Sequence, residues 1–310
     1  MAFILSLFGA AVFSIFTTVL ASSEWCYNSD DCGPEEWPNI HPLFCSGNEQ
    51  SPINIEVVET KWNSSLTNFC FSGYSDPRKL HLMKNTGHSV QVDFADGVTI
   101  SGGGLNETFK ALQFHLHWGN GSSVYGSEHT LNGCGFPMEM HILHIGEKFA
   151  NVSEAIKQNG IAVLGFFIDV ATTVDNNQAW EDFVNILPNI SSPDEKWQNA
   201  FPFSISDLLQ SVQKTKYFRY RGSLTTPTCD EGVTWTVFEK PILVTHKIVD
   251  KFATEVFINK STNVRLVNTY RHVQKLNKRT VFTSTSAFAR FKAEGQTMAL
   301  VAICLIWLTL

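Results

Sequence analysis

Two histidines separated by a single residue are the first candidates for chemistry in this sequence. Residues 113–118 read Gln-Phe-His-Leu-His-Trp. Because alternate side chains of a β-strand share one face, Gln113, His115 and His117 would point together, and the apolar residues between them would point into the opposite layer. Neutral imidazole is a common zinc ligand. The spacing is compatible with metal binding, although His-x-His by itself more often marks ordinary polar strand positions.

A second strand-like run strengthens the metal hypothesis. Residues 139–144 read Glu-Met-His-Ile-Leu-His, so Glu139, His141 and Leu143 share a face and His144 lies on the other. We therefore predict His141 as the third ligand and give His144 a structural role. A carboxylate two residues from a ligand suits a partner that accepts the second ring N–H. Glu139 would do this for His141, as Gln113 would for His115.

Three neutral ligands favour catalysis over a purely structural role for the ion. They leave zinc doubly positive with one open tetrahedral position, which is the arrangement that acidifies bound water most effectively. A closed structural site would need a fourth protein ligand. The sequence has no Cys-x-x-Cys pair of the kind that such sites use.

The elements that must hold these residues are mostly strands. Short β-rich runs recur between turn signals, and helical periodicity is weaker and local. We predict a mainly β (α+β) fold, a single domain around a large twisted, mostly antiparallel central β-sheet with short peripheral helices. The predicted strands are Ser89–Phe94, Val98–Ser101, Leu112–Trp118, Met138–His144, Ala162–Val170 and Val233–Phe238. The predicted helices are Gln178–Ile186, Ile205–Val212 and Thr245–Phe257.

Composition supports a single enzyme-sized domain. The 310 residues are 44% hydrophobic and 17% charged, without an internal repeat or a low-complexity stretch. The formal net charge is −6, and no block of Lys and Arg is long enough to follow a phosphate backbone. We therefore do not expect nucleic acid as a partner.

Both ends of the chain read as targeting signals. Residues 1–21 are apolar, uncharged in their side chains and end in Val-Leu-Ala, which predicts a secretory signal peptide. Ser284-Thr285-Ser286 is a run of small residues that precedes a more polar spacer, 287–296, and an apolar tail, 297–310. That order predicts a glycosylphosphatidylinositol (GPI) signal, with the anchor on Ser284 and residues 285–310 removed. A short tail anchor is the alternative.

Secretory features within the chain agree with this route. Asn-x-Ser/Thr sequons occur at Asn63, Asn106, Asn120, Asn151, Asn189 and Asn259. An oxidising compartment favours pairing among the six cysteines of the mature chain, which allow 15 complete pairings. These cysteines are Cys26, Cys32, Cys45, Cys70, Cys134 and Cys229.

Several motifs in a fixed order relate the chain to a known family. They are Ser51-Pro52-Ile53-Asn54-Ile55, the runs 113–118 and 139–141, Gly126-Ser127-Glu128-His129, and Gly222–Pro227 followed by Val233-Thr234-Trp235. In this order they resemble the alpha-class carbonic anhydrases. The resemblance implies that residues 22–284 form a catalytic domain for reversible, zinc-dependent hydration of carbon dioxide to bicarbonate and a proton, by attack of zinc-bound hydroxide.

The resemblance also implies a role for each matched residue. Zinc, one ion, would be held by His115, His117 and His141. Thr225 would accept a hydrogen bond from the hydroxide, and Glu128 would orient Thr225. An apolar wall for carbon dioxide would comprise Leu143, Val163, Leu224 and Trp235, with Thr226 as a polar contact for bicarbonate. The proton would leave through His88, along water ordered by Tyr27 and Asn85. The backbone carbonyl of Thr269 would orient His117.

Within the family, the cysteines resemble those of the membrane-anchored extracellular branch, the isoforms numbered four and fifteen. This implies disulfides Cys26–Cys32 and Cys45–Cys229 and assigns no partner to Cys70 or Cys134. It also implies a GPI-anchored enzyme at the extracellular face of the plasma membrane, where a bicarbonate or proton transporter could be a partner. The oligomeric state stays open.

Two other readings compete with this one. A cupin also holds metal with His-x-His on a strand, but it places a carboxylate a few residues after the second histidine, whereas Trp118-Gly119-Asn120-Gly121 follows here. Carbonic anhydrase-like domains that lost their zinc ligands serve as non-catalytic binding or adhesion modules. All three ligands and both Thr225 and Glu128 are present in this sequence, which favours an enzyme.

Overall fold

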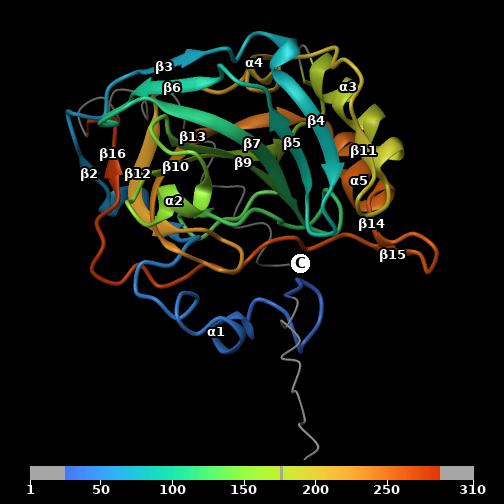
Figure 1. Ribbon diagram of the computed structural model, residues 1–310, viewed down its shortest axis with the longest axis horizontal. Coiled ribbons are helices and arrows are strands. Elements are labelled where there is room, and N and C mark those ends of the chain that lie inside the picture. The colour runs from blue at the N-terminus through green and yellow to red at the C-terminus, as the bar shows by residue number, and fades with distance from the viewer. Residues whose placement is uncertain (1–24, 175–176, 287–310) are drawn as a thin grey trace, which may run out of the picture.

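A single large sheet crosses the molecule, and short helices lie at its margins (Figure 1). The structure is a computed structural model that describes residues 25–174 and 177–286. The predicted signal peptide and the segments 287–296 and 297–310 lie outside the described residues. The mainly β, single-domain prediction is confirmed.

Within the described residues the main sheet has 12 strands. Its order is β11 (Lys196–Trp197), β4 (Leu80–Asn85), β5 (Val90–Phe94), β7 (Phe109–Trp118), β9 (Met138–Gly146), β10 (Ile161–Val170), β13 (Glu231–Val244), β12 (Tyr217–Ser223), β16 (Phe282–Thr283) and β2 (Lys61–Trp62). β6 (Thr99–Gly102) joins β3 (Phe69–Ser72) to β7. Most pairs are antiparallel, but β10–β13 and β16–β2 are parallel.

Smaller elements complete the fold. Two short ladders join β1 (Asn54–Ile55) to β8 (Thr130–Leu131) and β14 (Phe257–Asn259) to β15 (Val264–Arg265). The α-helices are α1 (Trp37–Ile40), α2 (Val152–Ile156), α3 (Gln178–Ile186), α4 (Ile205–Leu208) and α5 (His246–Glu255). Single 3-10 turns are η1 (Val57–Glu59), η2 (Pro77–Lys79) and η3 (Leu187–Ile190).

All six predicted strands and all three predicted helices are present, and all but one of them have a shifted end. α3 has the predicted bounds. α4 stops at Leu208, four residues before the predicted end, because Leu209 leaves the helical conformation after a helix that Ser204 begins with a capping box. β7 begins at Phe109, upstream of the predicted start, and a bulge between Ala111 and Gln113 sets the register of the histidine run.

The alternation of side chains along β10 explains its continuous apolar sequence. Ala162, Leu164 and Phe166 pack into the larger core cluster. Val163 and Phe167 join a second cluster on the opposite face. A strand buried on both faces reads as an uninterrupted apolar run. The sheet is therefore covered on both sides here, and the second face is the one that carries the histidines.

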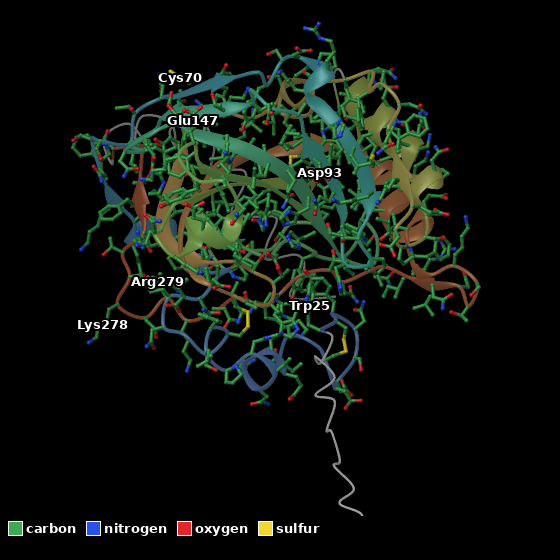
Figure 2. All side chains as sticks on the ribbon, viewed as in Figure 1. Trp25, Cys70, Asp93, Glu147, Lys278 and Arg279 are labelled. Carbon is green, nitrogen blue, oxygen red and sulfur yellow. A yellow bond between two sulfur atoms is a disulfide. The ribbon has the colours of Figure 1, made fainter. Side chains whose placement is uncertain are left out.

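The N-terminal arm is fastened by two disulfides, Cys26–Cys32 and Cys45–Cys229 (Figure 2), so both implied pairings are confirmed. The second joins residues 184 apart and packs with Trp37 in a small separate core. Closing so long a loop stabilises a fold by about 4–5 kcal/mol in the chain-entropy model. Cys70 is an exposed free cysteine on β3.

Surface features bear on the secretory predictions. Asn106, Asn120, Asn151, Asn189 and Asn259 are exposed and Asn63 is half-buried. In the part of the chain that the structure describes, no helix is long and apolar enough to cross a bilayer.

His144 gives a test of the core. It is fully buried, hydrogen-bonded through Nε2 to the Tyr74 hydroxyl at 2.7 Å, and burial lowers its pKa from 6.5 to about 3. Below pH 6.5 the unfolded chain binds this proton and the folded chain does not, so the free energy of unfolding should fall as pH decreases toward about 3.

We expect His144→Gln to reduce that slope by up to about 1.4 kcal/mol per pH unit. Urea unfolding of the metal-free protein across this pH range measures it. His81→Gln, at an exposed position, is the control. Equal slopes for His144→Gln and the wild type would show that His144 titrates normally in the fold.

Candidate active site

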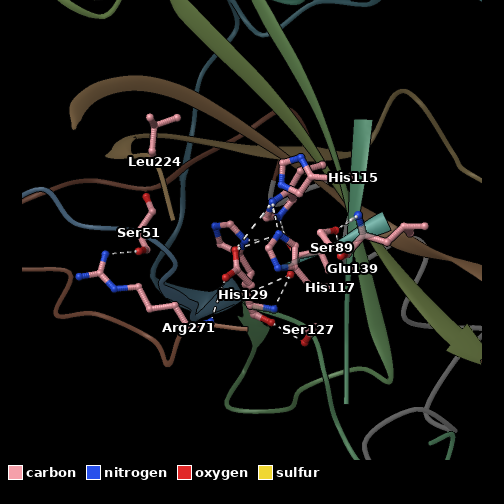
Figure 3. Close-up of polar contacts among 12 residues, drawn as sticks. Ser51, Ser89, His115, His117, Ser127, His129, Glu139, Leu224 and Arg271 are labelled. Atoms are coloured by element: carbon pink, nitrogen blue, oxygen red, sulfur yellow. Dashed lines mark hydrogen bonds and ion pairs between the residues drawn. The ribbon is translucent and has the colours of Figure 1, made fainter. Parts of the chain in front are cut away.

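Strand register brings the three predicted ligands together, and Figure 3 shows two of them, His115 and His117, within the polar cluster. His115 on β7 lies directly opposite His141 on β9, and His117 lies two residues further along the same face. Ligand atoms of the three rings lie within 4.8 Å of one another. His117 and His141 are each 1% exposed. Residues of one strand alone could not bring three ring nitrogens this close together. The cluster requires the pairing of β7 with β9.

Each ring donates its outer N–H to an oxygen atom. The pairs are His115 Nδ1 to Gln113 Oε1 at 2.9 Å, His117 Nδ1 to the Thr269 carbonyl at 2.6 Å, and His141 Nε2 to Glu139 Oε1 at 2.8 Å. The contacts foreseen for Gln113, Thr269 and Glu139 are therefore present. Because these bonds fix the tautomers, the inner nitrogen of each neutral ring carries a lone pair.

Facing lone pairs indicate a cation site. His117 Nε2 lies 3.1 Å from His141 Nδ1. Burial lowers the pKa of His117 and His141, and that of His115 to about 3, so the rings are neutral near pH 7. Two lone pairs at this distance repel unless a positive ion lies between them. Three neutral imidazoles are a donor set that suits zinc, so the residues fit a catalytic zinc ion.

Glu139 is held by a second layer of hydrogen bonds. Its Oε1 also accepts from His129 Nδ1 at 2.7 Å, and its Oε2 accepts from the backbone N–H groups of Glu128 and His129. Burial raises the pKa of Glu139, but His129 and His141 outweigh this and hold it well below its usual range. Glu139 is thus a fixed carboxylate.

The chain of contacts continues away from the site. Because His129 Nδ1 donates, its Nε2 accepts from the Tyr220 hydroxyl at 2.6 Å, and that oxygen accepts from Ser51 Oγ at 2.8 Å. Sequence reasoning quoted His129 and Ser51 within motifs without giving them roles, and it missed Tyr220. A Cβ on Gly222 would clash with Ser51 Oγ, which explains the glycine there.

Glu128 lies against the histidines. It is 1% exposed, its Oε1 accepts from the backbone N–H of Arg271 at 2.9 Å, and its Oε2 lies 3.4 Å from His117 Nε2. Burial raises the pKa of Glu128 well above its usual range, and a hydrogen bond with the Thr225 side chain opposes that rise. Thr225 and Glu128 therefore adjoin as the resemblance implied.

An apolar wall borders the histidine cluster on the same face. Cross-strand pairing aligns Leu143, Val163 and Trp235 on three neighbouring strands. The Trp235 ring centre lies 4.7 Å from that of His141, and its Nε1 donates to the Ser223 carbonyl. Leu224 packs against this cluster, and Thr226 is half-buried nearby in sequence.

The residues of the predicted proton path differ in their surroundings. His88 is half-buried and stacks on Trp25 with ring centres 3.9 Å apart, and Tyr27 lies 6.5 Å from His88. Asn85 is 1% exposed, donates to the carbonyls of Ser191 and Phe257, and accepts from the backbone N–H of residue 87. Asn85 therefore braces the turn that carries His88, and its water-ordering role stays a prediction.

A family model for eukaryotic-type carbonic anhydrases matches residues 32–285. The chain belongs to the carbonic anhydrases. It is 38% identical to carbonic anhydrase 4 of Rattus norvegicus over 274 residues, 84% of this chain and 85% of that protein. It is 36% identical to carbonic anhydrase 15 of Mus musculus, over 75% of this chain and 74% of that protein.

A more distant relative covers more of the chain. Carbonic anhydrase 12 of Homo sapiens is 33% identical over 90% of this chain and 78% of its own length. Membership of the family makes the chain a carbonate dehydratase, an enzyme that hydrates carbon dioxide. Family membership also removes the cupin alternative.

Glu139 should control metal affinity through His141. We expect Glu139→Gln to weaken zinc binding about 10- to 100-fold, because the amide has one acceptor oxygen and its NH2 group would face either the two histidine N–H groups or the two backbone N–H groups that the carboxylate accepts from. Competition with a chromophoric chelator measures the affinity. Glu147→Gln, an exposed glutamate just beyond β9, is the matched control. Unchanged affinity in Glu139→Gln would show that Glu139 is only a packing residue.

Proposed function

We propose that this carbonic anhydrase uses one zinc ion, held by His115, His117 and His141, to interconvert carbon dioxide and bicarbonate at the extracellular face of the plasma membrane. The observation that carries the zinc mechanism is the convergence of three imidazoles, two of them fully buried, whose outer N–H groups all donate to oxygen atoms. When bound, zinc supplies a Lewis acid that makes water a nucleophile near neutral pH.

Thr225 and Glu128 fix the direction of attack. The Thr225 hydroxyl donates to the buried Glu128 carboxyl, so only its lone pairs remain to meet the nucleophile. Such a threonine accepts a hydrogen bond from the nucleophile. The lone pair of the nucleophile then stays directed at the substrate. The backbone N–H of Arg271 donates to Oε1 of Glu128, which limits rotation of the carboxyl.

The apolar wall selects the substrate. Leu143, Val163, Leu224 and Trp235 form a surface that excludes water and suits uncharged carbon dioxide, which needs no cationic clamp. Thr226 supplies a polar contact for bicarbonate. Leu143 is large, so it also limits the width of the pocket.

His88 is our candidate for moving the proton out. Histidine is the side chain whose ordinary pKa suits proton transfer near neutral pH. In support, His88 is half-buried on the turn that Asn85 braces and stacks against Trp25. Tyr27 lines the same region, and burial keeps its hydroxyl protonated by raising its pKa.

The location is supported by features outside the site. The two disulfides fit an oxidising compartment, and five of the six sequons are exposed. With the signal peptide predicted at residues 1–21 and the GPI anchor at Ser284, they support an anchored, extracellular enzyme. The intact ligand set argues against the non-catalytic binding module.

Removal of metal or of one ligand tests the mechanism. We expect stopped-flow carbon dioxide hydration to be lost on chelation of zinc and restored by its return. His117→Ala should lower the rate at least about 100-fold and weaken zinc binding, because two imidazoles hold zinc poorly. His246→Ala, an exposed histidine, should match the wild type. Full activity in zinc-free protein would refute the mechanism.

A second variant tests proton transfer. We expect His88→Ala to slow hydration on the order of 100-fold in dilute buffer, because His88 hands the proton to solvent, and imidazole buffer should restore the rate. His81→Ala is the control at an exposed position. A His88→Ala rate that is normal in dilute buffer would assign the proton path to other groups.

A further inference from the structure

The folded domain continues without a spacer to the proposed anchor residue. The Ser284 backbone N–H donates to the Tyr217 carbonyl at 3.1 Å, and its Oγ accepts from the Tyr217 N–H at 2.9 Å and donates to the Thr215 carbonyl at 3.0 Å. A GPI anchor attached at Ser284 would therefore hold the surrounding protein surface near the bilayer, because the fold is hydrogen-bonded up to the anchor residue and the anchor's own glycan is the spacer.

That surface is the end of the sheet. β2 is the last strand beyond β16 among the described residues, and the two lie side by side in Figure 1. Trp62 pairs with Thr283, one residue before the proposed anchor, and the Asn63 N–H donates to the Thr283 carbonyl. Trp62 is 57% exposed, and Val58 on the preceding 3-10 turn is 90% exposed.

An exposed tryptophan at this place has a specific meaning. Tryptophan combines a large apolar ring with one N–H donor, and it is enriched where membranes meet water. Charged residues of both signs lie nearby, and the positive ones outnumber the negative ones. They are Lys61, Lys214 and Lys216 against Glu59 and Glu239, and the backbone N–H of Glu239 donates to the Lys216 carbonyl. Such a surface is compatible with phosphate headgroups.

We propose that Trp62, assisted by Val58, inserts into the headgroup region of the outer leaflet, so that the domain docks on the bilayer at the β16–β2 edge and the half-buried sequon residue Asn63 beside it carries no glycan. This rests on the anchoring at Ser284 that is part of the proposed function. Docking would fix the distance of the active site from the membrane surface. One row of paired residues crosses the sheet from His141 through Gly165, Val237 and Phe218 to Thr283. Four strand spacings put His141 about 19 Å from Thr283, and a fifth puts it about 24 Å from Trp62.

The test separates anchoring from docking. The full chain is displayed on cells and treated with phosphatidylinositol-specific phospholipase C; release supports the GPI anchor, and failure of release refutes it. Protein in the medium, released by the lipase or secreted, is then mixed with phosphatidylcholine vesicles, with and without phosphatidylserine, and the bound fraction is measured by flotation. This second measurement decides the docking whichever way the first one falls.

We expect Trp62→Ala to lower the vesicle partition coefficient about tenfold, Val58→Ser to lower it less, and Trp62→Phe to retain most of it. Leu43→Ala, an 86% exposed apolar residue on the N-terminal arm, should not change it. Carbon dioxide hydration in each variant confirms the fold. Equal partitioning of Trp62→Ala and the wild type overturns the proposal, as does a Trp62-dependent dimer in sedimentation velocity, which would assign the surface to a second copy.

Discussion

The convergence of three imidazole lone pairs is the interaction on which the rest of this structure depends. Without a cation, two of those nitrogens face each other at 3.1 Å, so the fold must supply the force that keeps them together. It does so with oxygen acceptors behind each ring. The most extensive network lies behind His141. There Glu139 accepts four hydrogen bonds, and the network extends from His129 to Tyr220 and Ser51.

A segment without regular secondary structure connects this site to the N-terminal arm. The carbonyl of Thr269 receives the N–H of His117, and two residues later the backbone of Arg271 donates to Glu128. The buried Arg271 guanidinium donates to Gln50 Oε1 and to the carbonyls of Ser51 and Cys45. The arm, the Cys45–Cys229 disulfide and the metal site therefore support one another, although no strand joins them.

Apolar and polar side chains lie on opposite sides of the histidines on the inner face of the sheet. From the histidines in one direction, pairing aligns Leu143, Val163 and Trp235. In the other, Gln91 lies opposite His115, and Asp93 bonds both Gln91 and Lys84. The metal site thus has apolar side chains on one side and polar ones on the other, because side chains of one face meet across neighbouring strands.

The sequence by itself determined the local half of this site. Period-two alternation put Gln113, His115 and His117 on one face and separated His141 from His144, since these relations need only the geometry of a single strand. The strands, α3 and the capped start of α4 follow from local patterns in the same way. The resemblance supplied the disulfide pairing and the neighbours Thr225 and Glu128.

Only the tertiary structure decided which distant groups meet. His117 and Thr269 are 152 residues apart, and Tyr220 and Ser51 are 169 apart, so no local pattern signals either contact. The same holds for the stack of Trp25 on His88. It also holds for Asn85, whose amide N–H groups donate to backbone carbonyls of two other segments. Such contacts depend on strand register and on the path of the N-terminal arm, which are set by burial of both faces of the sheet and not by neighbouring residues.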